Sequence, residues 1–519
     1  MKWYKKAIIA VASLLLLIVL LNVGLNFWIA KRLPHIINEA NDSPYQITYK
    51  NLDISLLSRD LKATEIVLVP KSSLNNSANK AGIYANIESL DVANFNIWDL
   101  AFSNKIHAKS LTLTKPEITI IKDRKKIKRD EKAIRNEIVE PFGKLVYVSD
   151  VFLIHANLRM VDTDNKPILT VHNLSFNLEK ILITEETLAQ KLPFSYEKYT
   201  VVCDSLFYQP NPFYHIRGKN FKTTEQELKI GSFEMIPEHS RKGFVKLIPK
   251  EKDQFAIKAK SIAVNQLKWG FKKDGFFFNT DAIVLDELDA NIYRNKMPND
   301  DLTKKKLYNN LLRNIPFELK VDTLLIKNSR LVYEEEIDFS KGPGILTFNQ
   351  FNMFVTGISS AKNKAKLPDV KIKVKCKFMN VAPLDVDWTF NVLDKSDGFN
   401  IKGKIFNFPA ERISAFTKPY INASLKGNLD EVYFNFTGND NNAKGDFAIN
   451  YDDLKVDIYK KKDRKKKNKF LTSLANLFVK DDTKDKVNTA EVELDRIKEK
   501  SFYNFLWRSI AEGLKKILI

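Results

Sequence analysis

The sequence has few of the residues that build cross-linked or metal-bound proteins. Its 519 residues include 2 cysteines and 6 histidines, which excludes a disulfide-rich scaffold and a multi-cysteine zinc or iron–sulfur protein. Glycine, at 17, and proline, at 18, are too scarce for a collagen-like or low-complexity chain. Two arrangements remain open for Cys203 and Cys376: one disulfide, or two separate buried thiols.

Motifs that carry chemistry are also missing. No two histidines stand in H-x-x-x-H spacing, and neither a phosphate loop nor a G-x-S-x-G elbow is present. Asp385 and Asp387 form a D-x-D pair, for which a polar strand face is the simpler interpretation. The run Glu334–Glu336 can supply an acid/base pair or mark a hydrophilic turn. The sequence therefore predicts no enzyme activity, no catalytic residue, no metal site and no cofactor.

Negative charge is in deficit. Lys and Arg number 83 against 63 Asp and Glu, a formal net charge of +20, while 44% hydrophobic residues exclude a wholly disordered chain. The excess is concentrated in the runs Lys122–Arg135 and Lys460–Lys469. These runs fit solvated loops or contacts with anionic lipid headgroups. Nucleic acid is not an expected partner, because no RNA-recognition, helix-turn-helix or zinc-finger pattern is present.

Only one apolar run is long enough to cross a bilayer. Ala7–Ala30 contains no charged side chain, and at about 1.5 Å per residue a helix of this length spans a hydrocarbon core of about 30 Å. A cleaved signal peptide is the alternative, but the run exceeds the usual apolar region of about 7–15 residues. We therefore expect a cytoplasmic segment at 1–6, a transmembrane signal-anchor at 7–30, and the rest of the chain outside the cytoplasm.

Downstream of this run, apolar and polar residues alternate. Val370, Ile372, Val374 and Phe378 alternate with lysines, which places apolar and cationic side chains on opposite faces of a strand. The same alternation recurs in Phe255–Ala259, Val386–Val392, Phe399–Ile405, Val432–Phe436 and Leu454–Ile458. Antiparallel sheets with one buried face show this pattern.

A local unit repeats unevenly along the chain. It places two apolar residues, a break and two further apolar residues at 2-5-2 spacing, in Leu111–Ile120, Leu206–His215 and Leu324–Tyr333. The segment Phe152–Met160 is similar but one residue shorter. Each unit predicts two short strands that bend or pair at the break and keep the same face apolar. Such repetition favours an elongated, curved antiparallel sheet.

Helical signals are few. Short helices are expected near Asp301–Asn314 and Ala410–Thr417, and a longer amphipathic one at 491–519. In the last segment, Leu494, Ile497, Phe502, Leu506, Ile510 and Leu514 recur at helical spacing, with lysines off the stripe. Two interpretations stay open: a helix that lies on a membrane or meets a partner through Phe502, Leu506, Ile510 and Leu514, or a helix that covers the open end of the sheet.

The order of these segments resembles the AsmA-like family of bacterial envelope proteins, which is related to bridge-like lipid-transfer proteins. The resembling segments are Asn51–Val69 directly after the apolar run, Phe317–Glu335, Gly342–Ile358 and Ile421–Ile458, followed by a terminal helix with Phe502, Trp507 and Gly513. Together they cover most of the chain. The resemblance implies a long sheet folded lengthwise into an apolar groove.

Alternation alone leaves open whether the apolar face closes on a dry core or forms a groove for acyl chains; the resemblance favours the groove. The expected groove residues are Val370, Ile372, Val374, Phe378, Trp388, Phe390, Ile401, Phe434 and Phe436. The expected organisation is a β-rich groove segment at 31–300, a C-terminal AsmA-like β domain at 301–460, a basic and polar linker at 461–490 and an amphipathic helix at 491–519.

The functional expectation is an inner-membrane-anchored periplasmic protein that shields and transports phospholipids for outer-membrane biogenesis. Its partners would be phospholipid acyl chains, the membrane through the anchor and the C-terminal helix, and an outer-membrane or periplasmic protein. The alternative is an assembly or scaffolding factor for outer-membrane proteins, which binds them through exposed sheet edges without conducting lipid.

Overall fold

The computed structural model describes residues 45–55, 58–73, 80–96, 106–122, 146–188, 192, 194–272, 275–460, 467–469, 472, 483 and 486–518. The expected cytoplasmic segment 1–6 and anchor 7–30 lie outside the described residues, as do most of the first basic run and most of the linker 461–490. Among the residues that are described, no helix combines the length and the apolar character needed to cross a bilayer.

The chain divides into two compact units, the first comprising residues 1–210 and 216–225. Its described elements are β1 (Tyr45–Thr48), β2 (Asn51–Ser55), β3 (Asp60–Pro70), η1 (Lys71–Ser73), β4 (Gly82–Ala93), β5 (Ile106–Thr114), β6 (Glu117–Lys122), β7 (Val146–Asp162), β8 (Pro167–Ile183), α3 (Glu185–Leu188), β9 (Lys198–Asn211) and most of β10 (Tyr214–Thr224). The strands pair largely in chain order, and β4 and β7 each pair with both β5 and β6.

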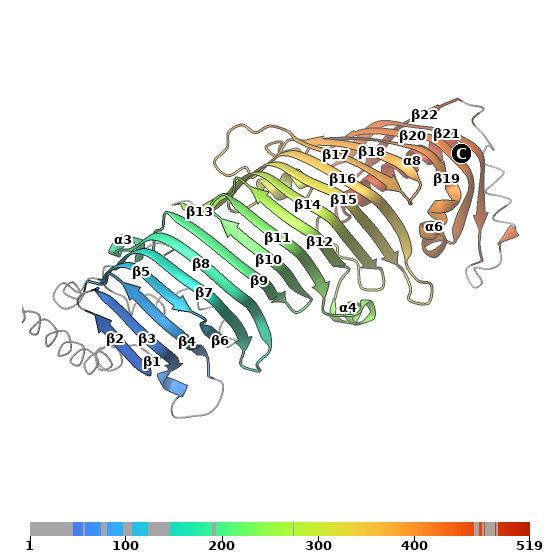
Figure 1. Ribbon diagram of the computed structural model, residues 1–519. Coiled ribbons are helices and arrows are strands. Elements are labelled where there is room, and N and C mark those ends of the chain that lie inside the picture. The colour runs from blue at the N-terminus through green and yellow to red at the C-terminus, as the bar shows by residue number, and fades with distance from the viewer. Residues whose placement is uncertain are drawn as a thin grey trace, which may run out of the picture. The chain divides into compact units, whose positions relative to one another are not determined.

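The second unit comprises residues 211–215 and 226–519. Its strands are β11 (Glu227–Pro237), β12 (Asp253–Asn265), β13 (Lys268–Lys272), β14 (Gly275–Asn295), β15 (Glu318–Glu336), β16 (Gly344–Ser359), β17 (Val370–Phe378), β18 (Ala382–Phe390), β19 (Phe399–Pro409), β20 (Ala423–Gly438), β21 (Asn442–Ile458) and β22 (Asn488–Asp495). Its helices are α4 (Arg241–Leu247), α5 (Tyr308–Arg313), η4 (Ala410–Ile413), α6 (Ser414–Ile421) and α8 (Phe502–Leu518). Figure 1 shows the strands β14–β21 side by side, with α6 and α8 near the last of them.

The expectation of a mainly β chain is confirmed, but the sheet is mixed rather than antiparallel. β5 and β6 run parallel to β7 in the first unit, and β14 runs parallel to β15 in the second. Parallel neighbours need a long crossover, and residues 296–317, with α5, supply one between β14 and β15. The helix expected at 491–519 is also shorter than predicted, because residues 488–495 form the last strand.

The break in the 2-5-2 unit contains a residue with positive φ, which lies within a strand or, for Lys115, between β5 and β6, and at which the alternation changes phase. Lys115, His155 and Asn173 in the first unit, and Glu287 and Asn328 in the second, have positive φ values between 44° and 54°. One such residue shifts the alternation by one position. Apolar residues that are two apart on either side of the break, and five apart across it, therefore lie on the same face. In Leu206–His215 the break is instead the turn between β9 and β10.

The apolar face of the first unit consists of four rows that cross its strands. The paired residues are Ile54–Leu61–Val92–Leu111–Val151–Leu178–Tyr199, Leu52–Ala63–Leu90–Leu113–Leu153–Phe176–Val201, Ile47–Leu68–Ala85–Ile118–Leu158–Val171–Leu206 and Ile83–Ile120–Met160–Leu169–Tyr208. The apolar face of β7 therefore includes Val151 and Leu153, and its spacing is the full 2-5-2. This corrects the predicted unit, which began at Phe152 and was one residue shorter.

The second unit repeats these rows. They are Leu228–Val264–Ile283–Leu324–Val355–Ile372–Trp388–Ile401–Phe436, Ile230–Ile262–Leu285–Ile326–Met353–Val374–Val386, Met235–Ile257–Ala290–Leu331–Phe348–Phe378–Ala382 and Phe255–Ile292–Tyr333–Leu346. Ring contacts of 5.4 Å between Phe348 and Phe378, and 5.2 Å between Phe378 and Phe408, extend the third row. Cross-strand apolar pairs of this kind stabilise a sheet.

Polar side chains join neighbouring strands along the line of breaks. The Nζ of Lys115 lies 2.9 Å from Glu88 of β4, and His155 Nδ1 lies 2.6 Å from Asn173 Oδ1 of β8. In the second unit, Asn328 donates its amide to Asp286 at 3.1 Å, and its backbone N–H donates to Asn352 at 3.1 Å. These contacts satisfy backbone and side-chain groups that the ladder leaves unpaired at a bulge.

This geometry predicts the cost of changing a break residue. Asn328→Val places a β-branched residue at φ 52° and should destabilise the second unit by about 1–2 kcal/mol. Asn328→Gly keeps the conformation accessible and should cost less. Denaturant unfolding of each variant gives the free energies. Lys327→Val, at the exposed neighbouring position, is the matched control; an equal loss there would contradict the assignment.

Candidate functional site

The apolar rows of the first unit form the first part of the candidate site. Most of their side chains are half-buried. Tyr208 is 41% exposed, and the buried row residues are Ile54, Ala63, Ala85, Leu153, Val171 and Tyr199. The described part of this unit contains no helix longer than the four residues of α3. An apolar sheet face is stable when a second layer covers it. The described residues thus leave a half-exposed apolar surface that an apolar occupant can cover.

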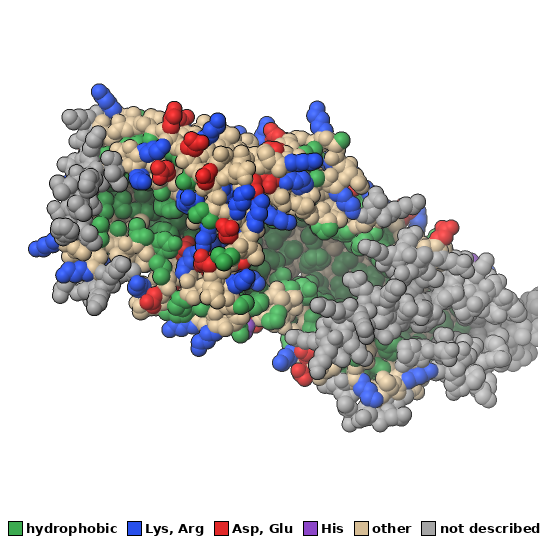
Figure 2. Space-filling view, turned by 180° about the vertical axis from the view of Figure 1, so that it is seen from behind, with side chains coloured by type: hydrophobic (Ala, Val, Ile, Leu, Met, Phe, Trp, Pro, Cys, Tyr) green, Lys and Arg blue, Asp and Glu red, His purple; other side chains and the backbone are tan. Residues whose placement is uncertain are grey.

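Over β11, β12 and β14 of the second unit, many row residues are again half-buried. Ile257, Ile262, Leu285 and Ile292 are half-buried, whereas Val264 and Ala290 are buried. Figure 2 shows hydrophobic side chains gathered on one face of the molecule, with charged side chains around them. Each unit by itself therefore presents a candidate apolar contact face.

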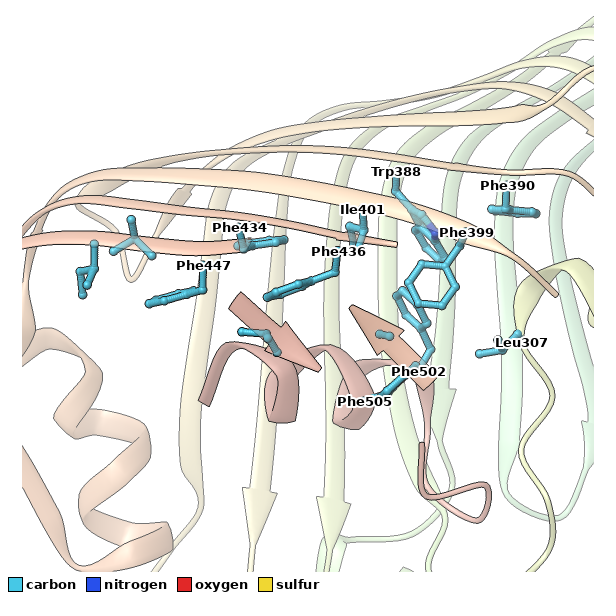
Figure 3. Close-up of a cluster of buried hydrophobic side chains, with 14 of the residues drawn as sticks. Leu307, Trp388, Phe390, Phe399, Ile401, Phe434, Phe436, Phe447, Phe502 and Phe505 are labelled. Atoms are coloured by element: carbon cyan, nitrogen blue, oxygen red, sulfur yellow. The ribbon is translucent and has the colours of Figure 1, made fainter. Parts of the chain in front are cut away.

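Further along the second unit, the same rows lie beneath helices. A core of buried residues combines strand residues with Leu307, before α5, and with Phe502 and Phe505 of α8. Figure 3 shows α8 below the strands, with Phe502 beneath Trp388 and Phe399. The rings of Trp388 and Phe502 stack at 4.5 Å with an interplanar angle of 6°. This end of the sheet is a closed, aromatic-rich core.

The structure places all nine expected groove residues on the apolar face. Val370, Trp388, Phe390, Ile401, Phe434 and Phe436 are at most 8% exposed and belong to the closed core. Ile372 packs against this core, Phe378 packs against a second cluster, and Val374 is half-buried. β17 covers Val370–Phe378, as the alternation predicts.

The expected membrane-surface residues of α8 lie against the sheet. Phe502 is 5% exposed, and Leu506, Ile510 and Leu514 are partly buried against the core. Gly513 brings the helix onto β21, since a Cβ at this position would lie 2.4 Å from the Cβ of Phe447. The stripe thus occupies the position expected of a helix that covers the sheet.

A second cluster lies where η4 and α6 meet the sheet. Met379, Ala382, Phe408, Ile413 and Phe416 are buried together. Tyr333 and Leu346 of the fourth row pack against them. Helix α6 therefore closes the edge of the apolar face on which β15 and β16 end.

Ion pairs fix the segment between β14 and α5, here termed the strap (residues 296–307). Lys500, just before α8, lies 2.9 Å from Asp300, and the Lys305 N–H donates to the Lys498 carbonyl at 2.7 Å. Asp301 pairs with Lys305, and hydrogen bonds from Lys305 and Thr303 lower the pKa of Asp301 to about 2. The strap and the start of α8 thus hold each other in place.

The buried guanidinium of Arg496 links the strap to the hairpin of β20 and β21. Its side chain is fully enclosed, and it pairs with Asp440 and with the carbonyl of Lys305. Burial raises the pKa of Asp440, but Lys304, Arg496 and Lys498 outweigh this effect and lower it. Removing one partner of such a pair leaves the other charge buried and is costly.

A charged row borders the apolar rows at one end of β12, β14 and β15. Arg294 pairs with Asp253 through two hydrogen bonds of 2.6 and 2.8 Å, and Glu335 is its neighbour on β15. Burial lowers the pKa of Arg294, but Asp253 reverses this effect. Burial and the adjacent Glu335 raise the pKa of Tyr420 to about 12. The apolar rows therefore end at a border of polar and charged groups.

The acidic run is part of a strand and not a hydrophilic turn. Glu334 and Glu336 lie within β15 and are buried on the face opposite the apolar rows. Glu334 accepts from Arg241 of α4 and Asn291 of β14, both at 2.6 Å, and Glu336 accepts from Tyr293. α4 supplies the cationic partner and β14 supplies the amide and hydroxyl donors, and no local sequence pattern shows these partners.

The remaining candidates from the sequence are the D-x-D pair and the two cysteines. Asp385 and Asp387 stand opposite Lys375 and Lys373 on a polar strand face. Cys203 and Cys376 are separate buried thiols, and burial raises the pKa of Cys376 to about 12. Within the described ranges, no group of three or more His, Cys, Asp or Glu residues is placed to hold a metal ion.

Comparisons with known proteins supply no family. No protein-family model matches the chain, and no curated protein matches it. Among solved structures, the crystal structure of Sex pheromone staph-cAM373 precursor is similar at 8% sequence identity over 63% of this chain and 80% of that chain. The TM-score of 0.11 is too low to support an argument about fold or function.

Sequence reasoning missed the half-exposed row residues of the other strands. The densest apolar alternation lies in β17–β20, which is the part that the helices close. Leu285 lies in the open part, in a strand where a break interrupts the alternation, whereas Ile257 lies within the alternation Phe255–Ala259 but was not assigned to the groove. A search for 2-5-2 spacing in every strand would have found them.

The packing of α8 predicts an inverted effect of alanine at Gly513. At an ordinary helix position Gly→Ala stabilises by about 1 kcal/mol, but Gly513→Ala forces a Cβ onto Phe447 and should destabilise. Urea unfolding measures the change. In a Phe447→Gly background, which removes both the Cβ and the Cγ that the new methyl group would meet, the same substitution should lose most of its cost; an unchanged cost would show that the contact is not its cause.

The strap predicts an acid-dependent contribution to stability. Because the pKa of Asp301 is lowered, its contribution is present above about pH 4, the ordinary aspartate range, and is lost as the pH falls through about 2. Asp301→Asn should therefore lower the unfolding midpoint at pH 6 and have little effect at pH 2. A difference that persists at pH 2 would refute the role of this carboxylate.

Proposed function

We propose that this chain shields and carries phospholipids along the apolar rows of its sheet, as an anchored envelope protein that serves outer-membrane biogenesis. The proposal depends on one observation. Each unit has four apolar rows that continue from strand to strand and stay half-exposed over many strands. The ordered resemblance to AsmA-like proteins supports the envelope setting, the inner-membrane anchor at 7–30 and the periplasmic location.

The dimensions of the rows fit acyl chains. Strands lie about 4.8 Å apart, and residues two apart on a strand are separated by about 6.8 Å. An acyl chain lying across the strands, between two rows, meets a new apolar side chain at every strand. Its burial is worth about 0.8 kcal/mol per methylene. The rows thus offer hydrocarbon the contacts that a second protein layer would otherwise provide.

Repetition of the rows lets a lipid move without chemistry. The pairs Ile118–Leu158 and Leu158–Val171 present similar surfaces on successive strands, so a shift by one strand exchanges one set of contacts for an equivalent set. In this function no residue is catalytic and no cofactor is required. Direction would come from a gradient or from a partner protein.

The closed end limits where a lipid can lie. Phe390 and Phe436 are in contact with the protein's own core, so acyl chains would contact the open rows instead. Leu113, Leu158, Ile257 and Leu285 represent such positions. A charged residue at Phe390 would disrupt folding, whereas one at an open row would block lipid without removing a core side chain.

The first experiment is mass spectrometry of the lipids that the full chain retains after purification. The chain would be extracted in a detergent and exchanged into an amphipathic polymer, and the lipids bound per chain would be compared with those of an unrelated single-anchor protein. Several phospholipids per chain above that control support the proposal. Retention equal to the control would overturn it and favour the scaffolding alternative.

A matched pair of substitutions tests whether the apolar face is the lipid site. Leu285→Glu places a charge in the second row, whereas Val284→Glu places the same charge at the adjacent half-buried position on the opposite face. Leu285→Glu should reduce bound lipid several-fold, and Val284→Glu should not. Circular dichroism checks folding, and an equal reduction by both variants would contradict the assignment.

A further inference from the structure

The outward side of the covering helices carries a cluster of exposed apolar residues. Leu302 of the strap is 72% exposed, Tyr503 is 62%, Leu311 of α5 is 49%, Trp507 is 46% and Ile497 is 43% exposed. We term these five residues the docking patch. They differ from the stripe Phe502, Leu506, Ile510 and Leu514, which faces the sheet.

Contacts between the elements bring the members of the patch together. Tyr503 Oη lies 3.4 Å from the Oη of Tyr308, one turn before Leu311 on α5. The Lys305 N–H bonds to the Lys498 carbonyl, which joins the strap segment of Leu302 to the residue after Ile497. Tyr503 and Trp507 are four residues apart on α8, hence on one side of the helix. The patch spans the strap, α5 and α8 within the second unit.

The charge of the segments that carry the docking patch favours an anionic partner. Residues 296–313 and 495–518 contain 11 Lys and Arg and 5 Asp and Glu. Seven of these cations, including the buried Arg496, pair with carboxylates of this unit, whereas Lys306 is exposed. Lys515 and Lys516 are exposed at the end of α8. Exposed tryptophan, tyrosine and leucine, with exposed lysines on the same segments, match a bilayer interface, where aromatic rings sit at headgroup level and each cation gains about 1 kcal/mol from anionic lipid.

We propose that the docking patch binds the surface of an anionic bilayer. This inference rests on the proposed lipid function and adds the contact through which a membrane meets the second unit. The buried side of α8 holds the patch in a fixed orientation, so binding needs no release of the helix from the sheet. The occupant is a lipid surface; a protein partner is the alternative outcome of the test.

The test places a reporter beside the patch in the full chain. An environment-sensitive dye on Ala511→Cys, an exposed position of α8, reports contact with vesicles of phosphatidylcholine and phosphatidylglycerol with brominated acyl chains. Because the readout is local, insertion of the N-terminal apolar run elsewhere in the vesicle does not produce it. The same dye on Lys373→Cys, on the polar face of β17, is the positional control.

We expect a blue shift and bromine quenching at position 511, at anionic vesicles, and neither at position 373. Tyr503→Ser/Trp507→Ser should weaken vesicle binding at position 511 about 10-fold or more, since it removes two interfacial anchors. Trp269→Ser/Phe271→Ser removes two exposed aromatics of β13 and should leave binding unchanged. Higher salt should weaken binding.

Two outcomes overturn the inference: no quenching at position 511, which assigns the patch to a protein partner, or equal quenching in the Tyr503→Ser/Trp507→Ser variant. Lipid retention separates this result from the proposed function. The patch lies outside the open rows, so this variant should retain the wild-type amount of lipid. Retained lipid without docking refutes the docking patch alone, and docking without retained lipid refutes the lipid carrier alone.

Discussion

The arrangement of this protein depends on one backbone constraint: the side-chain alternation must change phase within the long strands, so that the same face stays apolar on both sides of the break. Side chains alternate strictly along a strand, so an unbroken β15 would turn Leu331 and Tyr333 away from the face that holds Leu324 and Ile326. The positive φ of Asn328 prevents this. The parallel ladder of β14 and β15 is interrupted after the pair Asp286–Lys327, directly before Glu287 and Asn328, which both have a positive φ, so the two strands change phase together and the rows stay continuous.

Continuous rows create a second requirement, since an apolar face must be covered. The chain meets it with α5, α6 and α8 over the last strands of the second unit. Over the open rows the described residues provide no comparable layer. The second row illustrates the change: Leu285 is half-buried in the open part, and the row then passes through Met353 and Val386, which pack against the closed core. The same type of residue thus serves two kinds of surface.

The sequence predicts local strand structure, but it does not predict which elements cover the apolar face. The alternation Val370–Phe378 fixed both ends of β17, and 2-5-2 spacing located the breaks, because both depend on neighbours in the chain. The parallel pairing of β14 with β15 depends on a long crossover, which alternation does not encode. The surroundings of the acidic run Glu334–Glu336 could not be predicted either, because its partners Arg241 and Tyr293 lie far from it in sequence.

The position of α8 also bears on what the open rows require. Phe502 and Leu506 provide the sheet with an apolar partner, and Gly513 allows an approach close enough to exclude water. The row that passes through Trp388 beneath this helix passes through Ile283 in the open part, so the two parts present the same kind of side chain to an occupant. The chain therefore contains its own example of an apolar body bound to these rows. An acyl chain in the open part would satisfy the same physical requirement, with the difference that its weaker, strand-by-strand contacts allow it to move.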